Sequence, residues 1–152
     1  MFCRGPRSDD IVYVCRSAET RIISINLLVG ARLPAYCTSM GQILLAQLPP
    51  EALDAYLERV QLVARTDRTT ITAAKLRKRL KAVREAGHAL LDQELEVGLR
   101  SIAVPVRDAR GAVIAAMNVS SHASHVDLGE MQQRFLPVLT QSARSLSAVL
   151  LG

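Results

Sequence analysis

A turn runs directly into the start of a helix in the stretch Gly30-Ala31-Arg32-Leu33-Pro34-Ala35-Tyr36-Cys37-Thr38-Ser39-Met40-Gly41-Gln42. Thr38 or Ser39 can cap this helix, and Ser39 with Gln42 fits the spacing of a capping box. The first turn of a helix presents unpaired backbone N–H groups and the positive end of the helix dipole. Residues 38–41 are therefore predicted to cradle a carboxylate. No catalytic base or nucleophile accompanies them, which favours binding over catalysis.

Strand and helix patterns alternate on both sides of this stretch. The period-two and β-branched runs predict strands at residues 11–15, 22–27, 90–91, 102–106 and 112–120, the first two paired as a hairpin and the last two as another. Capping residues and prolines predict helices that begin at Ser39, Pro50, Thr72 and Asp127, with Gly87 ending the third and Pro137 kinking or splitting the last. This order predicts an α+β domain with a mainly antiparallel sheet flanked by helices.

Composition narrows the functional class. The chain has 152 residues, the length of one domain, and 49% of them are hydrophobic. Aromatic residues make up only 3% of the chain, too few for a nucleic-acid stacking platform, so the net charge of +5 is interpreted as a solubilising surface. Three cysteines at unrelated spacings argue against a disulfide framework and favour the reducing cytoplasm. No apolar run has the length of a membrane span, and no signal-peptide pattern opens the chain.

Four motifs stand out along the chain. They are residues 30–41, Gly87-His88-Ala89-Leu90-Leu91-Asp92-Gln93-Glu94-Leu95-Glu96-Val97-Gly98-Leu99-Arg100-Ser101, Ile102-Ala103-Val104-Pro105-Val106 and Ala115-Ala116-Met117-Asn118-Val119-Ser120. Together they resemble the effector-binding domain of the IclR family of bacterial transcription regulators. The resemblance is greatest to the subgroup that controls β-ketoadipate-pathway genes and senses protocatechuate, 4-hydroxybenzoate or related acids. It implies a GAF-like domain over residues 10–152, an irregular N-terminal end at 1–9, and the absence from this chain of the winged helix-turn-helix domain that precedes this region in the family.

The resemblance also implies an effector site. Asn118 and Ser120 lie two residues apart on a predicted strand, so they share one face, and polar groups on a buried face need partners. A ligand is one such partner; a satisfied buried network or a solvent-exposed edge is another. The helix start at Thr38 likewise fits an ordinary capped helix when taken alone. The site residues implied by the family are Leu33, Thr38, Ser39, Met40, Gly41, Leu99, Ser101, Asn118 and Ser120.

The leading hypothesis is a ligand-sensing domain that binds a small aromatic or keto carboxylic acid. On this hypothesis the protein is not an enzyme and uses no cofactor or metal. It is expected to form a homodimer or tetramer, to bind no membrane, and to reach DNA only through the absent N-terminal domain. Two alternatives stay open. One is a small cytoplasmic enzyme that uses Cys37 or the carboxylates of residues 92–96, and the other is a dimerisation module with a vestigial pocket.

Overall fold

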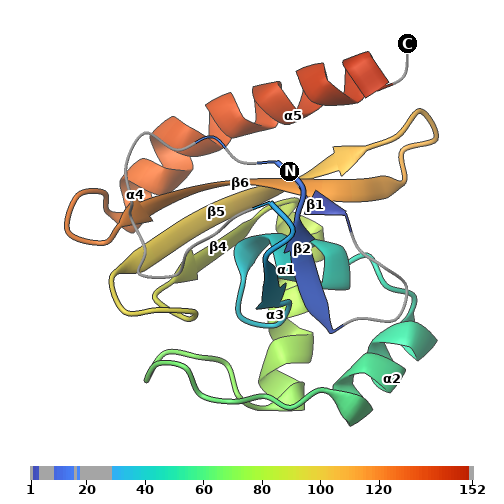
Figure 1. Ribbon diagram of the computed structural model, residues 1–152, viewed down its shortest axis with the longest axis vertical. Coiled ribbons are helices and arrows are strands. Elements are labelled where there is room, and N and C mark those ends of the chain that lie inside the picture. The colour runs from blue at the N-terminus through green and yellow to red at the C-terminus, as the bar shows by residue number, and fades with distance from the viewer. Residues whose placement is uncertain (1, 4–8, 16, 18–28, 151–152) are drawn as a thin grey trace.

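The computed structural model describes residues 2–3, 9–15, 17 and 29–150. Among these residues, six strands form one antiparallel sheet with the spatial order β3-β2-β1-β6-β5-β4 (Figure 1). The strands are β1 (Phe2–Cys3), β2 (Asp10–Tyr13), β3 (Arg32–Pro34), β4 (Ala89–Asp92), β5 (Leu99–Arg107) and β6 (Val113–His122). The prediction of an α+β domain with an antiparallel sheet is confirmed.

Helices cover both faces of the sheet. Figure 1 shows α5 lying along one face, with α1 and α3 on the other. Thr72 and Gly87 bound α3 as predicted: the Thr72 hydroxyl accepts a hydrogen bond from the Lys75 backbone N–H, and Gly87 adopts a left-handed φ of 74°. The helical segments are α1 (Ser39–Leu45), α2 (Pro50–Arg59), α3 (Ala73–Ala86), α4 (Leu128–Glu130), the π-helical η1 (Met131–Phe135) and α5 (Leu136–Leu150).

Pro137, predicted to kink or split the last helix, lies in the first turn of α5, and the helical residues run on from Leu128 to Leu150 with a change of helix type just before it. Proline lacks a backbone N–H and cannot complete the regular helical ladder. The preceding residues Met131–Phe135 widen into a π-helix between α4 and α5. Asp127 caps the start of α4, where its carboxylate accepts a hydrogen bond from the Glu130 backbone N–H at 2.8 Å.

Side-chain alternation along β5 and β6 divides the interior into two cores. Ile102 and Val104 of β5 face α5, whereas Ala103 between them faces α1. On β6, Ala115 faces α5 and Ala116 faces α1. The core on the α1 side also contains Met40, Ile43, Leu45, Leu76 and Leu80, and the core on the α5 side contains Met131, Leu139 and Ala143.

Two segments differ from the sequence-based expectations, and a third cannot be compared with them. The irregular end expected at residues 1–9 contains β1, because Phe2–Cys3 pairs with both β2 and β6. Residues 32–34, expected within a turn, form β3 at the edge of the sheet, where the missing N–H of Pro34 removes no interior ladder bond. The strand expected at 22–27, with its hairpin pairing, lies outside the described residues.

No helix in the described part of the chain is long and apolar enough to cross a membrane.

Candidate functional site

A cavity of about 20 Å³ lies between the start of α1, the facing parts of β5 and β6, and the turn that follows β4. Seven of the nine predicted site residues line it. They are Thr38, Ser39, Met40, Leu99, Ser101, Asn118 and Ser120. The other lining residues are Tyr13, Cys37, Leu91, Glu94 and Leu95.

The sheet register explains why the polar side chains meet. Ser101 on β5 pairs with Ser120 on β6, and Ala103 pairs with Asn118. Residues two apart on a strand point to the same face, so the Asn118 and Ser120 side chains share the α1 side of β6. The Asn118 Nδ2 donates a hydrogen bond to the Ser120 Oγ at 3.1 Å. A row of hydroxyl and amide groups therefore faces the start of α1.

Thr38 is the N-cap of α1. Its hydroxyl accepts a hydrogen bond from the Gly41 backbone N–H at 3.3 Å. The capping box expected between Ser39 and Gln42 does not form, because Ser39 already lies inside the helix. The Gln42 side chain is instead fully buried, and its Nε2 donates to the Tyr36 backbone oxygen at 2.9 Å. The N–H groups of Ser39 and Met40 are the first two of the helix and have no carbonyl one turn earlier to bind.

Leu33 and Gly41 do not line the cavity. Leu33 lies on β3, pairs with Ile11 and belongs to the α1-side core. The Gly41 N–H is already bound by Thr38, and a Cβ at this position would overlap the backbone of Ala35. Close packing thus accounts for this glycine, and its N–H is not available as an anion donor.

Five lining residues were not among the predicted effector-site residues, and one of them, Cys37, was considered only under the alternative of an enzyme. Tyr13 comes from β2, and Leu91 comes from β4, where it pairs with Ser101. Glu94 and Leu95 lie in the turn after β4. Alternation along the 90–91 strand could have placed Leu91 beside Ser101. No local signal separates Glu94 from its acidic neighbours, because its position depends on the partners described below.

The Cys37 thiol lines the cavity but is only 1% exposed. Burial raises the pKa of Cys37 to about 11, and the charge of Glu94 adds to the rise, against a lowering contribution from Arg65. Burial likewise raises the pKa of Tyr36, whose hydroxyl donates to the Val63 backbone oxygen at 2.8 Å. At neutral pH the Cys37 thiol is protonated, whereas nucleophilic cysteines act as thiolates.

Iodoacetamide at neutral pH is therefore expected to label Cys15, which is exposed, and to leave Cys37 unlabelled in the folded chain. Both should react once urea unfolds the protein. Peptide mass spectrometry after a time course measures the two rates. Labelling of Cys37 at the rate of Cys15 under native conditions would restore Cys37 as a candidate nucleophile.

Asp92, at the end of β4, binds two arginines. Its Oδ1 accepts from the Arg100 Nε at 2.6 Å, and its Oδ2 pairs with Arg68. Arg100 also donates through Nη1 to the backbone oxygens of Ala123 at 2.9 Å and Val126 at 2.8 Å. Burial alone would raise the pKa of Asp92, but hydrogen bonds from Arg100 and Gln93 and the two arginine charges outweigh it and hold the pKa below 3.8.

A lowered carboxyl pKa in the folded state stabilises the fold above the unfolded-state pKa, and this contribution is lost as the pH falls through the lowered value. The unaltered chain should therefore have a higher free energy of unfolding than Asp92→Asn, and the difference between the two should be largest at neutral pH. The difference should shrink at about pH 3 and below. Urea titrations of both chains at the two pH values test this; a difference independent of pH would contradict it.

The comparisons with known proteins agree on one family. The family described as "Bacterial transcriptional regulator IclR C-terminal" matches residues 6–148. The chain is similar to the Pca regulon regulatory protein of Pseudomonas putida, with 52% identity over 145 residues, covering 95% of the chain and 50% of that protein. It is 34% identical to the p-hydroxybenzoate hydroxylase transcriptional activator of Acinetobacter baylyi, covering 88% of the chain and 49% of that protein. The chain thus spans about half the length of these curated relatives.

A solved structure shares the fold. It is a double mutant of the PobR transcription factor inducer binding domain from Acinetobacter, in complex with 3-hydroxybenzoic acid. The TM-score is 0.89 at 31% sequence identity, and the match covers 96% of this chain and 85% of that one.

Proposed function

Because the chain belongs to the IclR family of bacterial transcriptional regulators, as their C-terminal domain, we propose that it senses a small aromatic or keto carboxylic acid. The ligand binds in the cavity between α1 and the β5–β6 pair. Its occupancy is passed to a DNA-binding domain outside the present chain. From the same family membership we propose a cytoplasmic regulator that acts as a homodimer or tetramer and catalyses no reaction.

One observation carries the proposal. Hydroxyl and amide groups from α1, β5 and β6 meet at one cavity, in a domain that resembles a double mutant of the PobR inducer binding domain solved in complex with 3-hydroxybenzoic acid. Ser39, Ser101, Asn118 and Ser120 supply hydrogen-bond donors there, and Met40, Leu91 and Leu99 supply apolar wall. A few placed polar groups on an apolar wall are typical of small-molecule sites.

Charge orients the ligand. The Glu94 side chain lines the cavity and is only 4% exposed. Arg79 offsets part of the Glu94 charge. The donors around the Glu94 carboxylate are thus already taken, and a second carboxylate beside it would meet a like charge in a buried setting. The ligand carboxylate therefore lies at the other side, against the N–H groups of Ser39 and Met40 and the polar side chains of β6. Of the three backbone N–H groups predicted to bind the carboxylate, those of Ser39 and Met40 are kept. The Gly41 N–H is left out because it already binds the Thr38 hydroxyl.

A thermal-shift and calorimetric screen tests the proposal. The panel contains 3- and 4-hydroxybenzoate, protocatechuate, β-ketoadipate and pyruvate, with methyl 4-hydroxybenzoate as the matched compound that lacks a carboxylate. A ligand at a hundred times its dissociation constant should stabilise the fold by roughly 2.7 kcal/mol. At least one acid should do so and the ester should not. Absence of any shift across the panel, or an equal shift with the ester, would contradict the proposed function.

A further inference from the structure

The cavity is too small for the ligands proposed above. A volume of about 20 Å³ holds on the order of one water molecule. Ligand pockets are usually several hundred Å³, so a wall must move for an aromatic or keto acid to bind. Helix α1 and strands β4, β5 and β6 are held by regular backbone hydrogen bonds. Of the other lining residues, Tyr13 belongs to the paired strand β2, and Cys37 and Thr38 precede α1, where the Thr38 hydroxyl binds the Pro34 oxygen and the Gly41 N–H. The turn at residues 93–98, which contributes Glu94 and Leu95, is the part of the wall that we take to be the movable one.

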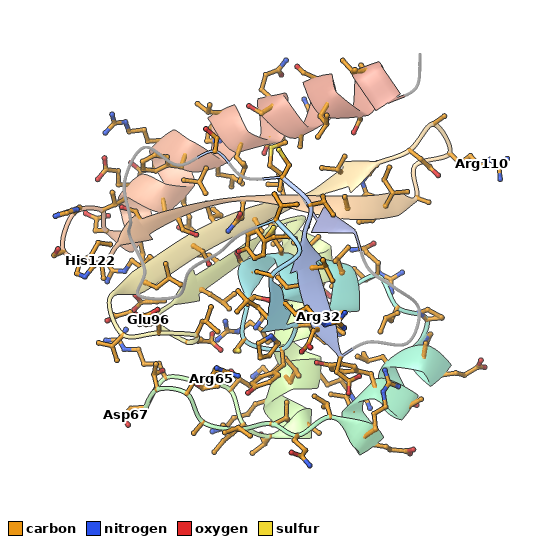
Figure 2. All side chains as sticks on the ribbon, in the orientation of Figure 1. Arg32, Arg65, Asp67, Glu96, Arg110 and His122 are labelled. Carbon is orange, nitrogen blue, oxygen red and sulfur yellow. The ribbon has the colours of Figure 1, made fainter. Side chains whose placement is uncertain are left out.

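Polar contacts with the loop at residues 65–70 hold this turn in place. The Thr66 hydroxyl donates to the Gln93 backbone oxygen at 2.6 Å, and the Thr69 hydroxyl donates to the Glu94 backbone oxygen at 2.7 Å. Thr69 is only 8% exposed, and its Oγ1 also accepts from the Arg65 and Thr66 backbone N–H groups at 3.0 and 2.9 Å. Figure 2 shows the loop that carries Arg65 and Asp67 running beneath the turn that carries Glu96.

The Glu94 carboxylate adds a charged connection. Its Oε1 accepts from the Arg79 Nη1 on α3 at 2.9 Å, and its Oε2 accepts from the Thr70 backbone N–H at 3.3 Å. A buried carboxylate that loses its partner is strongly destabilising, so this pair favours the closed position of the turn. The same side chain therefore both lines the cavity and binds the loop and α3.

The turn also contains a residue in an unfavourable backbone conformation. Gln93 has a φ of 60°, a region that non-glycine residues seldom adopt. Its backbone N–H donates to the Leu99 oxygen at 2.8 Å, and its Oε1 accepts from the Gly98 N–H at 3.0 Å. Such strain persists only where surrounding contacts hold it, and it occurs at ligand clamps and switch regions.

We propose that Thr66, Thr69, Thr70 and Arg79 form a latch that holds the 93–98 turn closed over the cavity, and that effector binding releases it. This inference rests on the proposed function and concerns the regulation of the same site. The ligand binds the open position, so its apparent affinity is reduced by the fraction of molecules that are closed. Weakening the latch therefore tightens binding, whereas damage to the binding groups weakens it.

Thr69→Val tests the latch because it removes the hydroxyl and keeps the side-chain shape. Thr140→Val is the matched control, since the Thr140 hydroxyl only donates to Leu136 within α5, at 2.8 Å. Without ligand, hydrogen–deuterium exchange of the 93–99 amides should accelerate about threefold to tenfold in Thr69→Val, the equivalent of the one hydrogen bond that Thr69 donates to the turn, and stay unchanged in the control. Calorimetry with the panel acid that gives the largest thermal shift should show a similar gain in affinity.

Thr66→Val is the second latch variant: it removes the hydroxyl that donates to the Gln93 backbone oxygen and leaves the charges at the cavity unaltered. The same directions are expected for it, and it decides the question if Thr69→Val does not fold. Faster exchange together with tighter binding supports the latch. Unchanged exchange, or faster exchange with equal or weaker binding, overturns it while leaving the proposed function intact. If the unaltered chain binds none of the acids, the proposed function fails. The latch is then judged on exchange alone: acceleration at residues 93–99 supports it and no change overturns it.

Discussion

Replacing Asn118 by leucine is expected to lower the affinity for the best acid of the panel at least about tenfold. Asn118 lies on the cavity face of β6, and its Nδ2 donates to the Ser120 Oγ. Leucine removes a donor from the side that faces the ligand and leaves Ser120 without this bond. A hydrogen bond to a charged group is worth roughly 1.5–3 kcal/mol, which corresponds to tenfold or more in affinity.

Calorimetric titration of the two chains measures this effect. Met117→Leu is the matched control, because its position on β6 faces α5 instead of the cavity, and it should bind as the unaltered chain does. Ser120→Ala is a smaller change at the same face and should weaken binding in the same direction. Equal affinities in Asn118→Leu and the unaltered chain would mean that the ligand binds at another part of the molecule.

Gly41→Ala is expected to lower the free energy of unfolding by about 3 kcal/mol. The added methyl group would overlap the Ala35 backbone and crowd the Thr38 hydroxyl that caps α1. Because Ala35 and the whole of α1 are buried, the overlap cannot be relieved by turning a surface side chain. The start of α1, which borders the cavity, must shift instead.

Urea unfolding of the variant and the unaltered chain measures the loss. Gly129→Ala makes the same change in another helix, where the added Cβ meets only the Asp127 side chain, at 3.2 Å. It should change the free energy of unfolding by less than about 1 kcal/mol. Similar values for the two variants would mean that the packing at Gly41 is looser than the structure indicates.

Local rules in the sequence determined the element boundaries around the cavity. A threonine cap depends on groups three residues apart, so Thr72 could be recognised without knowledge of the fold. At the first helix the sequence left Thr38 and Ser39 as alternatives, and the structure selects Thr38. The missing N–H of Pro137 acts on its own helix, and the two-residue period of a strand placed Asn118 and Ser120 on one face. The family resemblance then predicted how these elements come together, and the comparisons confirm the family and the fold class.

Only the tertiary structure decided which side chains border the cavity and what holds them. Gly41 fits the pattern of an anion donor, but its N–H binds Thr38 and its missing side chain makes room for Ala35. Glu94 resembles any carboxylate in an acidic run until Arg79 and Thr70 are placed beside it. Those partners lie 15 and 24 residues away in the chain. Contacts at that separation depend on how helices and loops pack over the sheet, and neither spacing nor local propensity encodes them.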